Sequence, residues 1–171
     1  MKRCVVLCAL VLWLCGVFRA QASMDIFLAL DGVPGESIAS GFADQIVIES
    51  FSTGLGNSGG GAPSFYDLSL SHALDKASPV LMLKCAQGAT IATAVLTCRT
   101  LSGAKPVPFY VIRLTNVKVT SVAVAGSGGG DRPTENFTLS FESIEWEYTP
   151  FNSNGSTGQS IKTKWDLPKA P

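Results

Sequence analysis

The sequence has few residues from which a reactive site is built. His72 is the only histidine in the chain of 171 residues. A zinc site would need ligands beyond His72, Cys85 and Cys98, and the spacing of these three matches no metal motif. Because His72 lies on an alternating segment beside Leu70 and Tyr66, we interpret it as a packed or rim histidine. We therefore expect no metal, no cofactor and no enzymatic activity.

Paired carboxylates in the arrangement of a glycosidase are also missing. Glu145 and Glu147 share one face of a predicted strand, whereas glycosidase pairs flank the scissile bond from separate elements. We interpret these two residues as a solvated strand face. In the charged segment 131–135, we expect a local ion pair that closes a turn.

Long apolar runs are absent except at the start of the chain. Lys2 and Arg3 precede the almost wholly apolar run 4–18, and Ala20-Gln21-Ala22 has the small residues of a cleavage site. This order predicts a cleaved secretory signal peptide over residues 1–22. The apolar run is too short for an ordinary membrane span, and no second candidate follows it. We expect an exported, soluble mature protein of one domain, residues 23–171.

Clustered basic residues are missing from this mature part. Removal of Lys2, Arg3 and Arg19 leaves 10 of the 13 basic residues against all 13 acidic ones, so the mature charge is −3. Binding to a phosphate backbone requires a basic patch. Nucleic acid is therefore not an expected partner.

Cysteine is scarce in the mature part, where only Cys85 and Cys98 remain. An oxidising compartment would allow these two to form a disulfide, but their sequence separation does not show whether their side chains meet. Both lie in apolar surroundings, where cysteine often behaves as a small hydrophobic residue. We favour two buried thiols and keep the Cys85–Cys98 disulfide as the alternative.

Alternating apolar residues predict strands over most of the mature chain. The pattern is clear at 24–31, 45–51, 65–73 and 160–165, and β-branched residues dominate from Thr90 onward. We expect the strand at 45–51 to be buried on both sides. The glycine-rich stretches 54–63 and 126–130 predict exposed loops, and 152–158 predicts a polar turn.

One helix is predicted over residues 79–87. Ser78 is placed to accept a hydrogen bond from the amides of the first turn, Pro79 occupies a position where its missing N–H costs nothing, and Gly88 suits a left-handed end. Apolar residues cover most of the circumference. We therefore expect the helix to pack on or inside a sheet.

Three shifts in the alternation predict bent or bulged strands. Apolar positions change parity between Leu114 and Val117, between Val119 and Val122, and between Phe141 and Ile144. We place the last irregularity at Glu142-Ser143. The chain is thus expected to be mainly β: a closed or nearly closed antiparallel β-barrel of two sheets with bent, bulged strands and one α-helix at one side.

Five stretches in one order resemble the haemolysin-coregulated (Hcp) tube proteins of bacterial type VI secretion. The resemblance spans 24 to about 166 and is carried by 24–37, 46–52, 75–88, 126–136 and 137–148. It implies a small barrel of two sheets with one helix. It also implies a six-membered ring that stacks into a tube, carries effectors in its lumen and meets sheath and tip proteins.

The resemblance also assigns residues. It places a loop that contacts a neighbouring subunit or ring at Gly56, Asn57, Gly59, Gly60 and Gly61, and it places Ser52 near the lumen. A secreted ring or tube subunit that carries effectors is our first hypothesis. An exported monomeric β-sandwich that recognises a glycan or a surface partner is the second.

The predicted signal peptide departs from the family, whose members load from the cytoplasm without an export signal. Either the protein is a divergent member sent through general export, or Met24 is the true start and the product stays cytoplasmic until type VI secretion. The complete cleavage site favours export.

Overall fold

A computed structural model describes residues 23–59, 61–102 and 105–167. The predicted signal peptide, residues 1–22, lies outside the described residues. Among those that are described, no helix is long and apolar enough to cross a membrane.

The described part is mainly β, as predicted, with nine strands and one helix. In chain order the elements are β1 (Asp25–Leu30), β2 (Ile46–Ile48), β3 (Ser50–Gly56), β4 (Ser64–Ala73), α1 (Ser78–Gln87), β5 (Thr90–Ser102), β6 (Lys105–Ala125), β7 (Thr134–Ser140), β8 (Ser143–Tyr148) and β9 (Ile161–Asp166).

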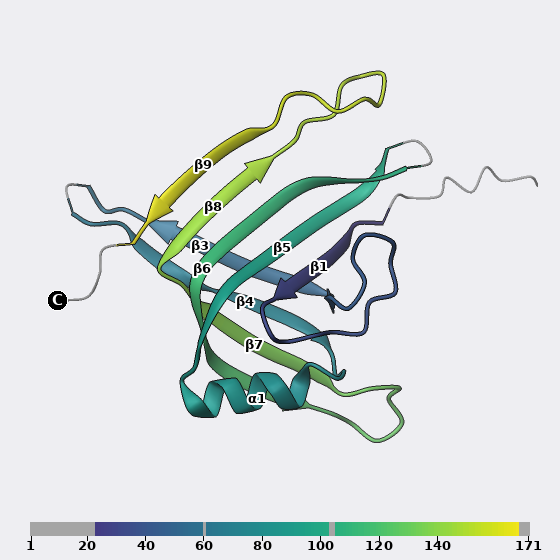
Figure 1. Cartoon of the computed structure of the whole chain (residues 1–171), viewed down its shortest axis with the longest axis vertical. Coiled ribbons are helices and arrows are strands. Elements are labelled where there is room, and N and C mark those ends of the chain that lie inside the picture. Colours follow the sequence, from purple (N-terminus) through teal and green to yellow (C-terminus); the bar gives the residue numbers. More distant parts are fainter. Residues whose placement is uncertain (1–22, 60, 103–104, 168–171) are drawn as a thin grey trace, which may run out of the picture.

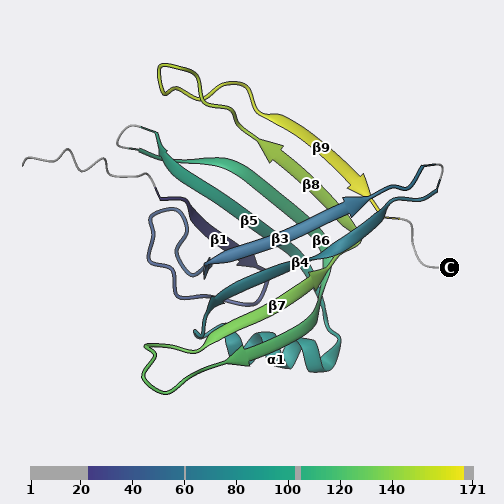
Figure 2. The same cartoon turned by 180° about the vertical axis from the view of Figure 1, so that it is seen from behind.

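All strand pairs are antiparallel, and the long strand β6 joins two layers. β5 pairs with β6 along its length, whereas the other edge of β6 pairs with β8 near its start and with β7 near its end. One layer therefore holds β9, β8, β6, β5, β1 and β2, and the other holds the end of β6 with β7, β4 and β3. Figure 1 shows the first layer in front, and Figure 2 shows β3, β4 and β7 from behind.

The barrel is nearly closed. β2 and β3 lie at opposite ends of the strand order, yet they are consecutive in the chain and separated only by Glu49. The Glu49 amide donates a hydrogen bond to the Ser71 carbonyl oxygen (N–O 2.8 Å). The segment containing β2 and β3 thus bridges the two layers by a bend, although no ladder between β2 and β3 completes the ring within the described chain.

Two irregularities in β6 lie where the alternation shifts in the sequence. Asn116 has a positive φ of 51°, between Leu114 and Val117. Farther on, the pairing with β7 slips between Val119 and Ser121, so that one extra residue enters the strand. Both predicted shifts in β6 are therefore confirmed. At each one the regular strand geometry is interrupted, and the apolar side chains change to the other side of the strand.

The third predicted irregularity is larger than a bulge. The chain leaves β7 after Ser140, and β8 begins at Ser143, so the two strands that share one edge of β6 are separated by Phe141 and Glu142. The Glu142 amide still donates to the Thr115 carbonyl oxygen (3.0 Å). The position of the break was predicted within two residues.

Two predictions near residue 50 are wrong. The segment 45–51 is not one strand buried on both sides, because Val47 is 50% exposed and the chain bends at Glu49. The glycine-rich loop is also shorter than expected, since β3 continues to Gly56 and pairs Gly54 with Tyr66. Strand pairing with β4 therefore overrides the low strand propensity of these glycines.

The helix begins at Ser78, one residue before the predicted start, and ends at Gln87 as predicted; it packs on a sheet, as predicted, but its N-terminal cap differs. Gly88 ends it in the left-handed conformation, as predicted (φ 57°). The Ser78 hydroxyl accepts a hydrogen bond from the Asp75 amide, not from the first turn, and Asp75 Oδ1 accepts the Ala77 amide. The helix lies against β6 at one end of the barrel rather than inside it, so only Ser78 and Leu81 are buried.

A continuous apolar core lies between the two layers. Its fully buried side chains come from both sheets and from the helix: Leu28, Ile46, Leu68, Leu81, Leu96, Ile112, Leu114, Phe137, Leu139 and Ile144. Burial of this area supplies the main driving force for folding.

One polar pair is embedded in this core. His72 on β4 and Glu135 on β7 have no exposed surface, and their Nε2 and Oε1 atoms are 2.8 Å apart. The prediction of a packed histidine is confirmed, while the prediction of a local ion pair within 131–135 is wrong. Arg132 instead reaches Glu36, 3.5 Å away, and Glu135 faces inward.

Cys85 and Cys98 are free thiols, so the structure does not contain the disulfide between them that we kept as an alternative. Cys85 is half-buried on α1, and Cys98 is buried on β5. Burial raises the pKa of the Cys98 thiol to about 11.

Replacement of Glu135 by alanine should destabilise the fold strongly. The change leaves the His72 ring buried without its partner, which costs about 3 kcal/mol or more in comparable cases. Urea denaturation of the mature chain measures this as a lower midpoint. Glu49→Ala, which removes an exposed carboxylate with no hydrogen-bond partner among the described residues, is the control and should stay within about 0.5 kcal/mol of the parent. Equal stability of the two variants would show that the buried pair contributes little.

The thiols should differ sharply in reactivity. Because the thiolate is the reactive form, Cys98 at pH 8 should have about a thousandth of its population ionised. A chain of residues 23–171 treated with iodoacetamide should therefore be alkylated at Cys85, and at Cys98 only in denaturant. Peptide mass spectrometry locates the label. Two unreactive sulfurs that both react after reduction would instead indicate a disulfide.

Candidate functional site

A regular polar surface lies on the outside of β3, β4, β7 and the end of β6. Neighbouring strands place residues in register, so partners across the sheet point to the same face. One row runs through Ser52, Ser69, Thr138 and Ser121, and the next runs through Ser50, Ser71, Asn136 and Ala123. We call these eight residues the hydroxyl face.

The sequence forms this face by strict alternation. Between the two rows lie Phe51, Leu70, Phe137 and Val122, which pair in the same register and point to the opposite side, where they belong to the core or pack against it. Each strand therefore contributes a small polar residue, an apolar residue and another small residue. This period of two buries one face and leaves the other in water.

Hydrogen bonds link hydroxyl groups along one edge of the face. Ser121 Oγ is 2.6 Å from Thr138 Oγ1, which is 2.7 Å from Thr120 Oγ1. The Thr120 hydroxyl donates to Asp67 Oδ2 at 2.6 Å. Because each hydroxyl has one proton, the donors run in sequence from Ser121 through Thr138 and Thr120 to the carboxylate.

The hydroxyl face is slightly hollowed and bears no charge. The hollow has a volume of about 380 Å³, and its lining contains no titratable side chain. Serine, threonine and asparagine both donate and accept hydrogen bonds, but they supply no acid or base near neutral pH. The arrangement offers an uncharged surface that can donate and accept hydrogen bonds.

The residues assigned by resemblance fall on two connected parts of the structure. Ser52 lies within the hydroxyl face on β3. Gly56 ends that strand, and Asn57, Gly59 and Gly61 form the exposed loop between β3 and β4, which projects beyond the sheet in Figure 1; Gly60 lies outside the described residues. The Asn57 side chain accepts a hydrogen bond from the Gly59 amide (3.0 Å).

Glu145 and Glu147, which we did not expect to be catalytic, lie on β8 outside the hydroxyl face and form ion pairs with basic residues. Arg113 Nη1 lies 3.1 Å from Glu145 Oε1 and 2.8 Å from Glu147 Oε2, and Lys162 Nζ lies 3.2 Å from Glu147 Oε2. The hydrogen bond from Arg113 holds the pKa of Glu147 below its ordinary value. Both carboxylates occupy the outer face of β8, opposite Ile144 and Trp146, as predicted. Together with Arg113 on β6 and Lys162 on β9, they form a row of ion pairs across the three strands.

Sequence reasoning assigned Ser52 but missed the rest of the hydroxyl face. The signal was present in Ser50-Phe51-Ser52, Ser69-Leu70-Ser71 and Asn136-Phe137-Thr138. Each triplet alone reads as an ordinary half-buried strand. Only the register between strands brings the three together.

Comparison with known proteins identifies relatives over most of the chain. A family described as "Type VI secretion system effector, Hcp" matches residues 27–148. Protein hcp1 of Pseudomonas aeruginosa is 34% identical over 155 residues, which cover 85% of this chain and 96% of that protein.

Solved structures agree with this match. A type six secretion system protein has a TM-score of 0.79 at 31% identity, over 85% of this chain and 96% of its own. Hcp1 from Salmonella typhimurium has a TM-score of 0.74 at 29% identity, over 85% of this chain and 95% of its own. A type VI secretion system effector from Yersinia pestis has a TM-score of 0.70 at 28% identity, over 84% of this chain and 100% of its own.

Proposed function

Because the chain belongs to the Hcp family of type VI secretion proteins, we propose that it is a structural subunit of a secreted ring or tube. Six copies close head to tail, and the rings stack. The hydroxyl face lines the channel, where effectors are carried. The subunit acts by assembly and not by catalysis.

The hydroxyl face is the observation that supports a channel wall. A wall along which polypeptides pass must stay wetted without holding its cargo firmly. Charged groups would retain cargo of opposite sign, and apolar groups would bind exposed hydrophobic patches. Rows of serine, threonine and asparagine avoid both effects, because each lost contact with cargo is replaced by water.

The projecting loop between β3 and β4 supports contact between copies. It extends the hairpin beyond the body of the subunit and carries small residues that allow close approach of another backbone. In the proposed tube, Asn57, Gly59 and Gly61 contact a neighbouring subunit or ring. Sheath and tip components are the further partners of such an assembly.

Export through the predicted signal peptide is the part of the proposal specific to this chain. Cleavage after Ala22 would release a mature protein that begins at Ser23. Amino-terminal sequencing of the native protein should therefore give Ser23 as the first residue. A sequence that begins at Met24 or Asp25 would instead support a cytoplasmic product that leaves only by type VI secretion.

The assembled mass tests the proposed ring. Residues 23–171, purified and studied by native mass spectrometry and negative-stain microscopy, should give six times the chain mass and annular particles. A head-to-tail ring closes without leftover surfaces, so a single dominant mass is expected. A species that remains monomeric at high concentration would favour a monomeric binding module recognising a glycan or surface partner.

The position of the hydroxyl face within the ring is tested by a heavy-atom label. In a Cys85→Ala background, Ser71→Cys labelled with maleimide gold should place density at the centre of the annulus. Gln159→Cys, in the exposed turn between β8 and β9, is the matched control for labelling away from the face. Peripheral density for the position 71 label would exclude this face as the channel wall.

A further inference from the structure

We propose that neighbouring copies of this chain join through an apolar knob and groove: Ile38 of one copy enters a groove formed by Leu55, Phe65, Trp146 and Trp165 of the next. This inference rests on the proposed ring, because it names the two surfaces through which the ring closes. We refer to these as the Ile38 knob and the aromatic groove.

The Ile38 knob is an apolar side chain held almost entirely in water. Ile38 is 98% exposed, the highest exposure among the large apolar residues of the described chain. Its neighbour Ser37 is buried, so the backbone is fixed while the isoleucine points outward. A single exposed apolar residue is common on protein surfaces, but an isoleucine exposed to this degree on a firmly held loop is positioned for a partner.

Hydrogen bonds hold the loop that carries the knob. The Gly35 amide donates to the Asp44 carbonyl oxygen (2.8 Å), the Ser37 amide to that of Gln45 (3.0 Å), and the Asp44 amide to that of Ser37 (2.9 Å). A Cβ atom at Gly35 would lie 2.4 Å from the backbone oxygen of Gln45, so the two segments touch directly. The knob is therefore presented with little conformational freedom to lose on binding.

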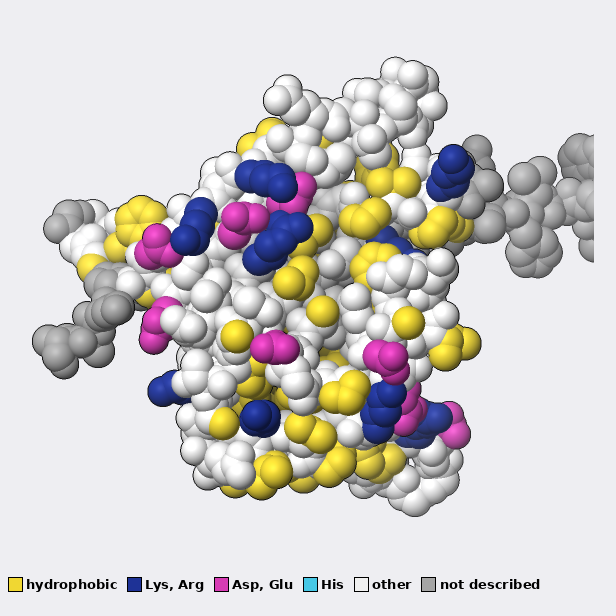
Figure 3. Space-filling view, in the orientation of Figure 1, with side chains coloured by type: hydrophobic (Ala, Val, Ile, Leu, Met, Phe, Trp, Pro, Cys, Tyr) yellow, Lys and Arg dark blue, Asp and Glu magenta, His cyan; other side chains and the backbone are white. Residues whose placement is uncertain are grey.

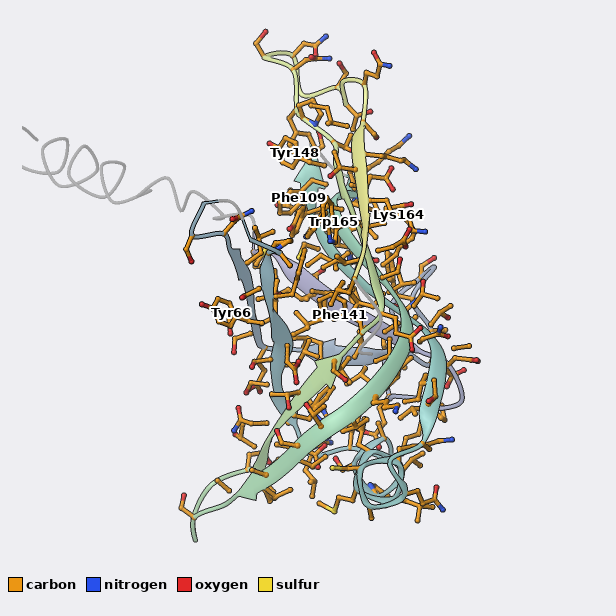
Figure 4. All side chains as sticks on the ribbon, turned by 90° about the vertical axis from the view of Figure 1, so that its left-hand side faces the viewer. Tyr66, Phe109, Phe141, Tyr148, Lys164 and Trp165 are labelled. Atoms are coloured by element: carbon orange, nitrogen blue, oxygen red, sulfur yellow. The ribbon has the colours of Figure 1, made fainter. Side chains whose placement is uncertain are left out.

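The aromatic groove lies where the two layers separate. Its apolar walls come from the β3–β4 hairpin on one side and from β8 and β9 on the other, and it has a volume of about 420 Å³. Phe65 stacks on Trp146 with ring centroids 6.3 Å apart, while Leu55 and Trp165 remain 54% and 46% exposed. Figure 4 shows Trp165 and Lys164, neighbours on β9, on the two sides of that strand.

The groove exposes a strand face that is core elsewhere in the same sheet. Trp165 is in register with Ile144, which pairs with Leu114, and both of these are fully buried. The apolar face of β6 and β8 thus continues onto β9, beyond the edge of the layer that holds β3 and β4. In the single chain, no residue of the facing layer covers Trp165 fully. Apolar faces of this kind mark contact sites.

A second copy is the occupant that the charges favour. The loop 31–45 around the knob carries Asp31, Glu36 and Asp44 and no basic residue. Lys76 pairs with Asp44 and Arg132 pairs with Glu36, so Asp31 is the acid of this loop without an ion-pair partner among the described residues. The lining of the groove contains one charged side chain, Lys164, whose ion pair with Asp166 is exposed to water. The opposite signs of Asp31 and Lys164 favour contact between two copies.

The two surfaces also lie on different sides of the subunit. Figure 1 shows the dark loop between β1 and β2 at the right and the ends of the β3–β4 hairpin and β9 at the left. Figure 3, in the same orientation, shows apolar side chains beside basic and acidic ones at that left end. A chain therefore does not fill its own groove, and the contact is heterologous, the type that generates rings.

Substitution of the knob is the first test. Ile38→Glu should convert the sixfold species of residues 23–171 to monomer in native mass spectrometry, with unchanged circular dichroism because the side chain is already exposed. Ile38→Leu should retain the ring. Leu83→Glu is the matched control, since Leu83 is a 56% exposed apolar residue on α1, away from both surfaces.

A disulfide across the contact is the second test. In the Cys85→Ala background, mild oxidation of a variant with both Ile38→Cys and Leu55→Cys should give a ladder of linked chains in a non-reducing gel. An equal mixture of the two single variants should give dimers at most, because each chain then has one reactive partner. Either variant alone should remain unlinked.

The outcomes separate this inference from the proposed function. A ring that survives Ile38→Glu, or that forms no link between positions 38 and 55, overturns the knob and groove but leaves the ring in place. Loss of the ring with Leu83→Glu while Ile38→Glu retains it would move the contact to α1 and overturn the inference. A parent chain that is monomeric under all conditions removes both proposals.

Discussion

The fold depends on one strand serving two layers. β6 begins in one layer, where it pairs with β5 and β8, and ends in the other, where it pairs with β7, so its buried face must change along its length. The positive φ at Asn116 and the extra residue near Thr120 make this change. Asparagine tolerates the left-handed conformation better than most residues, and the extra residue reverses the side-chain alternation. Without these two breaks, one layer would turn its apolar side chains toward water.

The same constraint explains what was predictable. Parity shifts in β6 and after Phe141 are visible in the sequence because a strand with one buried face must alternate, and any break in alternation must be a break in geometry. Gly88 was predictable because a helix end needs a left-handed residue. The bend at Glu49 was not, since Ile46, Val47 and Ile48 match a strand buried on both sides. Only the separate pairing of β2 with β1 and of β3 with β4 shows the bend, and Val47 is 50% exposed.

The candidate site shows the limit of sequence reading more clearly. Resemblance assigned Ser52, but its partners Ser69, Thr138 and Ser121 come from three other strands and become neighbours only through register. Glu135 shows the converse, because a segment of four charged or polar residues around Pro133 favours a solvated turn, whereas β7 begins at Thr134 and turns the Glu135 carboxylate toward His72. Local composition predicts which face is polar, and tertiary pairing decides which polar groups meet.

In the ring that we propose, each subunit has opposite requirements on its inner wall and on its flanks. The wall must not bind strongly, and small uncharged side chains meet that need because water replaces them at little cost. The flanks must bind in one orientation, which calls for apolar groups with a fixed shape and for charges that exclude wrong pairings. The hydroxyl face bears no charge, whereas Ile38 and Trp165 stand exposed among charged neighbours. Since a ring repeats every contact, even a modest apolar contact at one flank would act at every joint of the proposed ring, and the inner wall would not need to contribute to assembly.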